Sequence, residues 1–424
     1  MHWAALVLPS AVVAASSLHE QAIRLMEEFP LLDTHIDLPQ IIRSLNRRPL
    51  DALHELNSTF PGHVDIPRMR EGRLGGAFWT VWAPCYDVVG EDPGADFNAA
   101  TSHLRDSLEM LDLIQNMIAQ HPDDFQFARS SADVKQAFAN GKIASLMGME
   151  GTHMLGNSLS TLRIFAQLGV RYLTLTHTCH SAFASSVGAG TPLDAVHKGN
   201  GLSELGQELI KELNREGIMV DLSHTTDATM KQAISLSEAP VVWTHAGARA
   251  LLDHPRNVPD DVLKLIGDGP GKKDGVVQSV FFPGFIAPSD VNATVSHVAD
   301  HIEYIANIAG RNRVGIASDF DGMYLTIDGL EDASKYPNLV AELLRRGWSR
   351  EEMQGVLGGN LMRIMDKVDA VSERLKREIA PSSAIWEKRA DLPARSWGGG
   401  GVNVYWPEDV KAAVEQMPTR HDEL

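Results

Sequence analysis

Residues 143–150, Ile-Ala-Ser-Leu-Met-Gly-Met-Glu, form a short apolar run that ends in a carboxylate. Seven other short runs of apolar or β-branched residues recur along the chain, separated by longer segments. The eight runs are residues 31–37, 76–82, 143–150, 172–177, 219–224, 241–245, 276–282 and 314–319. Strands that alternate with helices form parallel sheets, and eight is the number at which such a sheet closes. The pattern predicts an α/β protein with a (β/α)8 TIM-type barrel.

The longer segments have apolar residues at helical spacing. Leu205, Leu209 and Leu213 lie four residues apart, and Gly217 follows where a helix would end. Two similar stripes predict a helix that starts near residue 96 and another that stops before residue 310. Their residues are Leu104, Leu108, Leu111 and Met117 in the first, and Val298, Ile302, Ile305 and Ile308 in the second.

Composition and length bound the class of protein. The 424 residues include 38 Lys and Arg and 55 Asp and Glu, which gives a net charge of −17. This charge argues against a nucleic-acid partner, because phosphate backbones are bound by clustered positive charge. No repeat or low-complexity linker interrupts the first 370 residues, so we expect one barrel domain over residues 18–370. Pro and Gly recur in residues 371–424, which predicts a tail that wraps the surface or meets a partner chain.

Both ends of the chain resemble signals of the secretory pathway. Residues 3–15 are apolar but shorter than the roughly 20 residues of a membrane span, so we expect residues 1–17 to be a signal peptide, although no Lys or Arg precedes them. The alternative is a cytoplasmic protein whose N-terminal segment packs on the barrel. The C-terminal residues His421-Asp422-Glu423-Leu424 predict retrieval to the endoplasmic reticulum lumen by a receptor. Two sequons, at Asn57 and Asn292, permit glycosylation.

Imidazole and carboxylate groups stand at the carboxyl ends of the runs, where such barrels place their active sites. His35 and Asp37 are two residues apart and therefore share a face of a strand. Five other runs end in Glu150, His177, His224, His245 and Asp319. A single His at a strand end is more often structural, and an isolated Asp such as Asp33 or Asp65 is usually a turn or cap residue. Convergence of the whole set is better explained by metal binding.

Divalent cations would offset the desolvation and repulsion of these groups. Imidazole and carboxylate ligands suit zinc, and manganese or cobalt could occupy the same site. Five or six protein groups can serve two metals only if one carboxylate bridges them, and we assign the bridge to Glu150. We expect His35 and Asp37 to bind one metal with Glu150, and His224 and His245 to bind the other.

Eight motifs follow one another over roughly residues 25–370. They are Asp33-Thr34-His35-Ile36-Asp37-Leu38-Pro39, Gly75-Gly76-Ala77-Phe78-Trp79, Met149-Glu150-Gly151, Arg171-Tyr172-Leu173-Thr174-Leu175-Thr176-His177, Val220-Asp221-Leu222-Ser223-His224, Thr244-His245, Arg256-Asn257-Val258-Pro259-Asp260-Asp261 and Ser318-Asp319-Phe320-Asp321-Gly322. In this order they resemble the renal, or membrane, dipeptidase family, a dinuclear zinc branch of the amidohydrolase-type barrels. The resemblance implies a homodimeric zinc dipeptidase that hydrolyses free dipeptides with a metal-bridging hydroxide.

The resemblance also implies roles for single residues. The family's zinc ligands match His35, Asp37, Glu150, His224 and His245, with Glu150 as the bridge. His177 matches a residue that contacts the substrate and stabilises the tetrahedral intermediate, and Arg256 matches one that binds the substrate carboxylate. Asp319 matches the acid/base beside the bridging water. Without the resemblance, a surface salt bridge would be the favoured interpretation of Arg256, and Asp321 would compete with Asp319.

Other positions concern stability and specificity. Cys85 and Cys179, the two cysteines of the chain, match a disulfide of secreted relatives, which fits an oxidising compartment. Thr34 and Ile36 replace the usual Gly and Asn beside the first ligands. Residues 279–284 are more apolar than their usual counterpart, which leaves the side-chain preference open. No apolar C-terminal stretch follows a small-residue site, so we expect no membrane anchor.

Two rival functions stay open at this point. The same chemistry could serve cysteinylglycine conjugates, in glutathione breakdown or a sulfur natural-product pathway, or a cyclic amide such as a β-lactam, because all present an amide near a carboxylate. A metal-free binding protein on the same fold would have lost metal ligands, whereas this sequence retains all five. Relative rates on cysteinylglycine, Leu-Gly and glutathione adducts would separate the substrates.

Overall fold

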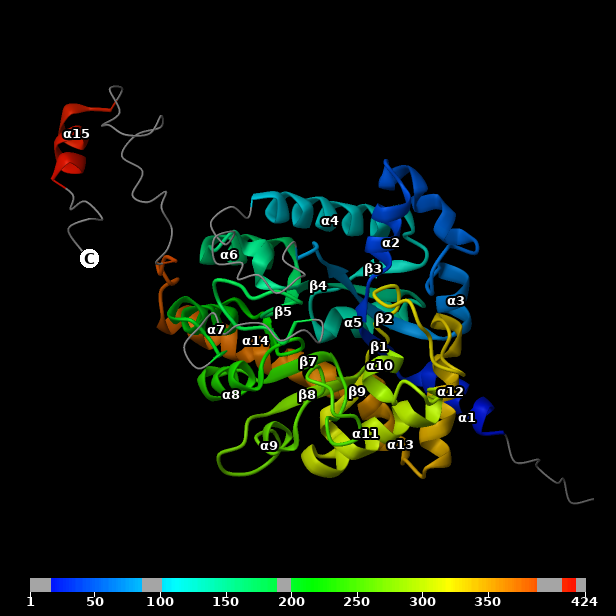
Figure 1. Ribbon diagram of the computed structural model, residues 1–424. Helices are drawn as coiled ribbons and strands as arrows, with labels where there is room; N and C mark the ends of the chain where they lie inside the picture. The colour runs from blue at the N-terminus through cyan, green and yellow to red at the C-terminus, as the bar shows by residue number, and fades with distance from the viewer. Residues whose placement is uncertain (1–16, 86–100, 189–199, 387–405, 417–424) are drawn as a thin grey trace, which may run out of the picture. The chain divides into compact units, whose positions relative to one another are not determined.

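The computed structural model describes residues 17–85, 101–188, 200–386 and 406–416 (Figure 1). The described chain divides into two compact units. The first extends to Ala384 and contains a barrel of strands surrounded by helices. The second begins at Ile385, and its described part holds the helix α15 (Glu408–Glu415).

The barrel is a closed parallel sheet. The strands are β1 (Leu31–Ile36), β2 (Leu74–Val81), β3 (Phe125–Phe127), β4 (Ile143–Glu150), β5 (Val170–Thr174), β6 (Met219–Asp221), β7 (Val241–Ala246), β8 (Gly275–Ser279) and β9 (Val314–Ile316). They are ordered β2-β1-β9-β8-β7-β6-β5-β4-β3, and β2 also pairs with β4, which closes eight strands into a ring and leaves β3 outside it. All of these pairings are parallel. The predicted (β/α)8 barrel is confirmed, with β3 as an unpredicted additional strand.

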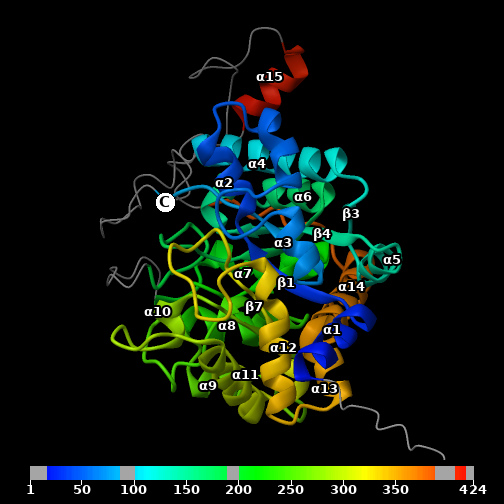
Figure 2. The ribbon, with the colours of Figure 1, turned by 90° about the vertical axis from the view of Figure 1, so that its right-hand side faces the viewer.

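Helices surround the strands, as two views at right angles show (Figure 2). They are α1 (Leu18–Glu28), α2 (Leu38–Leu45), α3 (Ile66–Glu71), α4 (Thr101–Gln120), α5 (Ser131–Ala139), α6 (Leu159–Leu168), α7 (Glu204–Glu216), α8 (Asp227–Leu236), α9 (Asp260–Leu263), α10 (Pro283–Ile286), α11 (Val295–Ala309), α12 (Tyr336–Arg345), α13 (Arg350–Gln354) and α14 (Asn360–Glu378). The helix predicted near residue 96 is described from Thr101, because residues 86–100 lie outside the described chain.

Two of the predicted helices end where the sequence indicates. Gly217 adopts a positive φ of 77° at the C-terminus of α7, a conformation that glycine adopts without steric cost. Gly310 follows α11 with a φ of 109°, which is also positive. The stripe predicted for α4 is wrong at Leu108, which is 43% exposed, because the buried face of that helix is centred on Met110, Ile114 and Met117.

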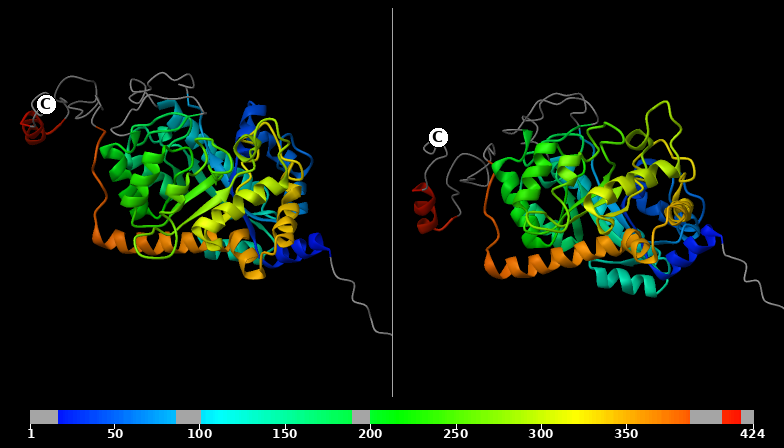
Figure 3. Two further views of the ribbon diagram at one scale, coloured as in Figure 1. Left: turned by 60° about the horizontal axis from the view of Figure 1, so that its bottom comes forward. Right: turned by 90° about the horizontal axis from the view of Figure 1, so that it is seen from below.

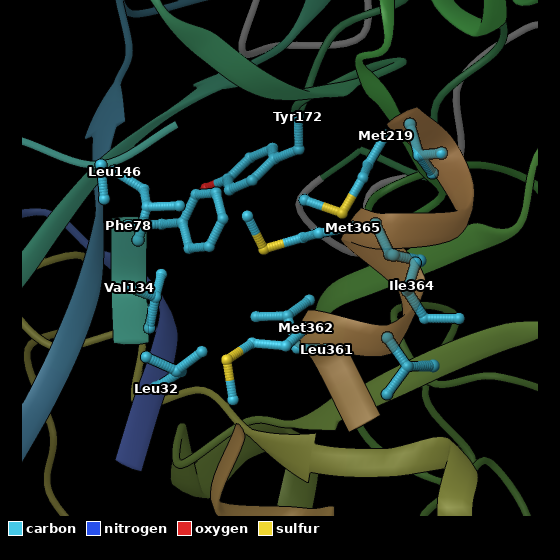
Figure 4. Close-up of a cluster of buried hydrophobic side chains, with 14 of the residues drawn as sticks. Leu32, Phe78, Val134, Leu146, Tyr172, Met219, Leu361, Met362, Ile364 and Met365 are labelled. Carbon is cyan, nitrogen blue, oxygen red and sulfur yellow. The ribbon is translucent and has the colours of Figure 1, made fainter. Parts of the chain in front are cut away.

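Helix α14 closes the end of the barrel at which the strands begin. In Figure 3 it runs along the underside of the barrel. Its apolar residues Leu361, Met362 and Met365 join a buried cluster with Leu32 and Tyr172 from the strands (Figure 4). This packing buries apolar area at one end of the barrel and leaves the opposite end, where the strands finish, free for polar groups.

Several predictions concern the ends of the chain. The predicted signal peptide, residues 1–17, lies outside the described residues except for Ser17, the N-cap of α1, and the C-terminal tetrapeptide 421–424 lies wholly outside them. Helix α14 continues past the expected domain boundary at residue 370. Asn57 and Asn292 are both exposed.

Among the described residues, no helix combines enough length with enough apolar character to cross a membrane.

Candidate active site

The polar residues predicted from the sequence meet at the mouth of the barrel. His35 lies in β1, Glu150 ends β4 and His245 lies in β7, while Asp37 is the N-cap of α2. Three others follow their strands by three residues in the connecting loops, namely His177 after β5, His224 after β6 and Asp319 after β9. The prediction that these three residues end their strands is therefore wrong, because each strand ends three residues earlier.

Backbone conformation explains two of these early strand ends. His224 has a φ of 64° and Asp319 a φ of 60°, in the left-handed region that a strand cannot contain. Residues other than glycine adopt this region at a cost, and such strain is concentrated at functional sites. Gly322 lies so close to Asp37 and Asp319 that this position has no room for a side chain. A Cβ there would lie 2.4 Å from Asp37 Oδ2 and 2.8 Å from Asp319 Oδ1.

A cavity of about 370 Å³ opens at this mouth. The predicted residues that line it are Asp37, Glu150, His177, His224, His245, Arg256 and Asp319. His35 is fully buried and reaches the same group of atoms from within the barrel. The structure thus brings together all eight residues that the sequence singled out for metal or substrate.

Glu150 is at the centre of the group, and its two oxygens face different partners. Oε2 lies 3.6 Å from His35 Nε2, which is in turn 3.3 Å from Asp37 Oδ2. Oε1 lies 3.0 Å from His224 Nε2 and 3.3 Å from His245 Nε2. One carboxylate therefore joins two sets of potential ligands, one on each oxygen.

The chemistry of this donor set fits divalent cations. Burial lowers the pKa of His224 and of His245 well below the usual range, so both imidazoles are neutral, which is the form that binds metals. Their Nε2 atoms are only 3.0 Å apart. Nε2 of His35 is buried and has no hydrogen-bond partner among the described residues. Burial also raises the pKa of Glu150, and bound positive charge would favour the ionised carboxylate.

Asp221, a residue that the sequence reasoning missed, orients the second set of ligands. It lies on β6, and its Oδ2 accepts hydrogen bonds of 2.6 Å from Thr174 on β5 and from Thr244 on β7. Since the Thr244 hydroxyl donates to Asp221, its oxygen can accept from Nδ1–H of His245, 3.0 Å away. This tautomer leaves the lone pair of His245 on Nε2, directed at Glu150.

We expect Thr244→Val to weaken metal binding by roughly 10- to 100-fold, because the change removes the hydrogen bond that fixes the His245 tautomer. Titration of the metal-free protein with Zn²⁺ measures this effect directly. The matched control is Thr80→Val in β2, where a buried threonine hydroxyl has no partner among the described residues. Equal affinities of the two variants would contradict the role of Thr244.

His35 is held in a comparable way from the other side of the barrel. Its Nδ1 lies 2.9 Å from the hydroxyl of Tyr172, which crosses the barrel interior from β5. Gly148 makes room for this ring, because a Cβ there would lie 2.0 Å from Tyr172 Cζ. Thr34, which departs from the family pattern, donates through its hydroxyl to the carbonyl of Thr244 at 2.7 Å and so ties β1 to the strand of His245.

The two aspartates predicted to be turn or cap residues have different outcomes. Asp65 is the N-cap of α3, as expected. The prediction is wrong for Asp33, which is buried within β1, accepts from His35 N and Ser318 N at 2.9 Å, and accepts from the Tyr336 hydroxyl at 2.6 Å. It therefore links the strand of His35 to the loop of Asp319. A charged residue inside an apolar run is the sequence signal that would have identified it.

Asp319 and Asp321 contact different groups. Asp319 Oδ1 lies 3.9 Å from His35 Nε2 and forms a potential ligand group with His35 and Asp37. Asp321 instead accepts from the backbone N–H of His63 at 2.6 Å and belongs to no such group among the described residues. Burial raises the pKa of Asp319 to about 8, which suits a group that exchanges protons near neutral pH.

Arg256 is not a surface residue. It is 3% exposed and lines the cavity, and no carboxylate of the described chain lies within 4.0 Å of its guanidinium. Its Nε and Nη1 are buried without hydrogen-bond partners in the described structure, while Nη2 reaches the carbonyl of His245 at 3.5 Å. Burial lowers the pKa of Arg256 to about 10, so the side chain remains charged. A buried cation without a carboxylate partner is suited to binding an anionic group.

The predicted disulfide is present. Cys85, after β2, and Cys179, after β5, are joined across β4, which lies between these strands in the sheet. Two residues near the disulfide, Trp82 and His177, line the cavity. Their rings contact each other, with centroids 5.5 Å apart. The bridge therefore connects the two loops that carry these side chains.

Comparison with known proteins agrees with the family resemblance of the sequence motifs. The model of the family described as membrane dipeptidase, peptidase family M19, matches residues 19–378. The chain is 40% identical over 360 residues to Dipeptidase verJ of Clonostachys rogersoniana, covering 84% of this chain and 88% of that protein.

Solved structures are similar over most of the barrel. The probable dipeptidase PvdM from Pseudomonas aeruginosa superimposes with a TM-score of 0.73 at 25% identity, covering 84% of this chain and 99% of that chain. A metallo peptidase from Rhodobacter sphaeroides, liganded with a phosphinate mimic of the dipeptide L-Ala-D-Ala, has a TM-score of 0.69 at 26% identity, covering 80% of this chain and 99% of that chain.

Proposed function

The chain belongs to the membrane dipeptidase family, peptidase family M19, and is a metallo-dipeptidase, and we propose that its active site holds two zinc ions that share Glu150. The single observation that carries this proposal is the division of the Glu150 carboxylate. Oε2 faces His35, and Oε1 faces His224 and His245. With Asp37 these residues are the five ligands expected from the sequence. The all-imidazole and carboxylate donor set favours zinc, with manganese or cobalt as possible substitutes.

When bound, two cations at this position supply Lewis acidity toward a carbonyl oxygen and lower the pKa of a water molecule. The protein supplies orientation and proton transfer. His177 is neutral because burial lowers its pKa well below the usual range. Its Nδ1 can accept from the Thr178 hydroxyl at 3.2 Å, which leaves Nε2–H to donate to a carbonyl oxygen that gains negative charge.

Arg256 explains the restriction to dipeptides. Its unpaired Nε and Nη1 suit bidentate binding of an α-carboxylate, which fixes the C-terminus of the substrate at one side of the cavity. Only the peptide bond next to that terminus can then reach the Glu150 centre. The likeness to the Rhodobacter sphaeroides peptidase, whose ligand mimics a dipeptide, supports a substrate of this size.

Asp319 is proposed to accept a proton from the attacking water and to pass it to the leaving amine. We expect Asp319→Asn to lower kcat by roughly 10²- to 10⁴-fold while the metal content stays unchanged, because the amide cannot transfer the proton. Asn tolerates the positive φ at this position, so the loop should be preserved.

The matched control for this variant is Asp321→Asn, two residues away and also at positive φ, 69°. It should change kcat far less, since Asp321 contacts His63 and not the ligand groups. Near wild-type turnover of Asp319→Asn on a simple dipeptide would remove Asp319 from the mechanism.

The cellular setting is also a proposal. A lumenal protein of the endoplasmic reticulum is supported by the C-terminal His421-Asp422-Glu423-Leu424 and by the Cys85–Cys179 disulfide, which fits an oxidising compartment. Its partners would then be the dipeptide substrate, the retrieval receptor and, by family resemblance, a second copy of the chain.

A further inference from the structure

Three aromatic side chains form one side of the active-site cavity. Phe282, Phe285 and Tyr324, called here the aromatic wall, all line it. The ring of Phe282 lies 4.7 Å from that of Phe285 and 6.1 Å from that of Tyr324, measured between centroids. Phe282 and Phe285 follow β8, whereas Tyr324 follows β9. The segment that contains α10 and the loop after β9 therefore build one continuous apolar surface.

The aromatic wall is exposed to solvent in the free protein. Tyr324 is 84% exposed, and Phe282 and Phe285 are half-buried. Exposed rings that rim a cavity gain free energy when a ligand covers them, because apolar area is removed from water and ring contacts form. The wall is thus suited to an apolar group of the substrate.

The wall adjoins Arg256. The guanidinium Cζ lies 5.1 Å from the Phe285 centroid. The following residue, Asn257, donates through Nδ2 to the Phe285 carbonyl at 2.8 Å and through its Oδ1 accepts from Gly247 N at 2.9 Å. These bonds hold the Arg256 loop and the wall together, so a carboxylate on Arg256 has a fixed position relative to Phe285.

This position identifies which part of a dipeptide meets the wall. A carboxylate bound to Arg256 at the usual roughly 2.9 Å places the C-terminal α-carbon beside Phe285. The scissile bond must extend the other way, toward Glu150. The side chain of the C-terminal residue is therefore the part within reach of the aromatic wall.

Charge in the cavity adds a restriction. Among the described residues that line it, Arg256 is the single Lys or Arg. With Arg256 engaged by the α-carboxylate, an acidic C-terminal side chain has no cationic partner among the described residues of the wall and would bury its charge against aromatic rings.

We propose that the aromatic wall binds the side chain of the C-terminal residue and selects dipeptides that end in a bulky apolar or aromatic residue. This inference rests on the proposed function of Arg256 and Glu150. Covering a phenyl side chain is expected to raise kcat/KM for Ala-Phe over Ala-Ala by a factor of roughly ten or more. Ala-Asp should be a poorer substrate than Ala-Ala.

The test compares kcat/KM for Ala-Phe, Phe-Ala, Ala-Ala and Ala-Asp in the metal-loaded wild type, Phe282→Ala, Tyr324→Ala and Leu325→Ala. The ratio of Ala-Phe to Ala-Ala does not depend on the fraction of folded enzyme, so a partly unfolded variant is still informative. Leu325→Ala is the matched control, because Leu325 is next to Tyr324 and 49% exposed but is not among the residues lining the cavity.

We expect the ratio to fall toward one in Phe282→Ala and, less steeply, in Tyr324→Ala, and to stay at the wild-type value in Leu325→Ala. A wild-type preference for Phe-Ala over Ala-Phe, no preference, or an unchanged ratio in Phe282→Ala would overturn the inference while leaving dipeptide hydrolysis intact. If the metal-loaded wild type hydrolyses none of the four dipeptides, the proposed function is overturned as well.

Discussion

A Glu150→Gln variant is expected to lose hydrolysis of dipeptides by roughly 10³-fold or more and to lose bound metal. The amide retains the size of the side chain but lacks the charge that two cations would share. Both ligand sets meet on this residue, one on each oxygen, so no other single change should disturb both. Metal analysis and initial rates on Ala-Ala measure the two effects.

The control for Glu150→Gln is Glu212→Gln. Glu212 is equally buried but pairs with Arg215 at 3.0 Å and Arg163 at 2.9 Å on the outside of the barrel. The control should be destabilised, because it removes the negative charge that pairs with Arg215 and Arg163, yet keep its metal. If Glu150→Gln binds the full complement of metal, the shared-carboxylate arrangement is wrong.

Arg256→Ala is expected to raise KM strongly and to remove the preference for a free C-terminus. Loss of a buried partner of a carboxylate costs about 2–5 kcal/mol, which corresponds to roughly 30-fold or more in kcat/KM. The comparison of Ala-Ala with its C-terminal amide measures the preference. Wild type should discriminate between them and Arg256→Ala should not.

Arg311→Ala provides the matched control for this experiment. Arg311 pairs with Glu352 at 2.7 Å and does not line the cavity. Its removal should leave the discrimination unchanged. An Arg256→Ala enzyme that still prefers the free dipeptide to the amide would refute the assignment of the carboxylate site.

Much of the fold could be predicted because the barrel strands are buried on both faces and read as apolar runs. The exception, β3, has three residues, of which Phe127 is exposed, so neither length nor burial separates it from a loop. The ends of β6 and β9 were placed too late, because the positive φ values of His224 and Asp319 leave no mark in the hydrophobic pattern.

The proposed metal ligands could be predicted because each lies at or near the end of an apolar run, and barrel closure brings such positions together whatever their separation in the chain. The residues that orient them could not. Asp221 acts on His245 only because β6 lies between β5 and β7, and Tyr172 reaches His35 only across the closed barrel. Their roles depend on spatial neighbours that no local pattern specifies.

The aromatic wall could likewise be predicted only in part from the sequence. The apolar character of residues 279–284 was visible in the sequence, but Tyr324 belongs to a loop that follows another strand. Only the folded chain places that ring beside Phe282 and next to Arg256.

The most direct measurement is the metal content of the purified protein, determined together with its hydrolysis of Ala-Ala before chelation, after chelation and after readdition of Zn²⁺. Two metal ions per chain are predicted, with activity lost on their removal and restored with their return. Undiminished hydrolysis by fully metal-free protein, or full activity with a single metal per chain, would contradict a dinuclear centre built on Glu150.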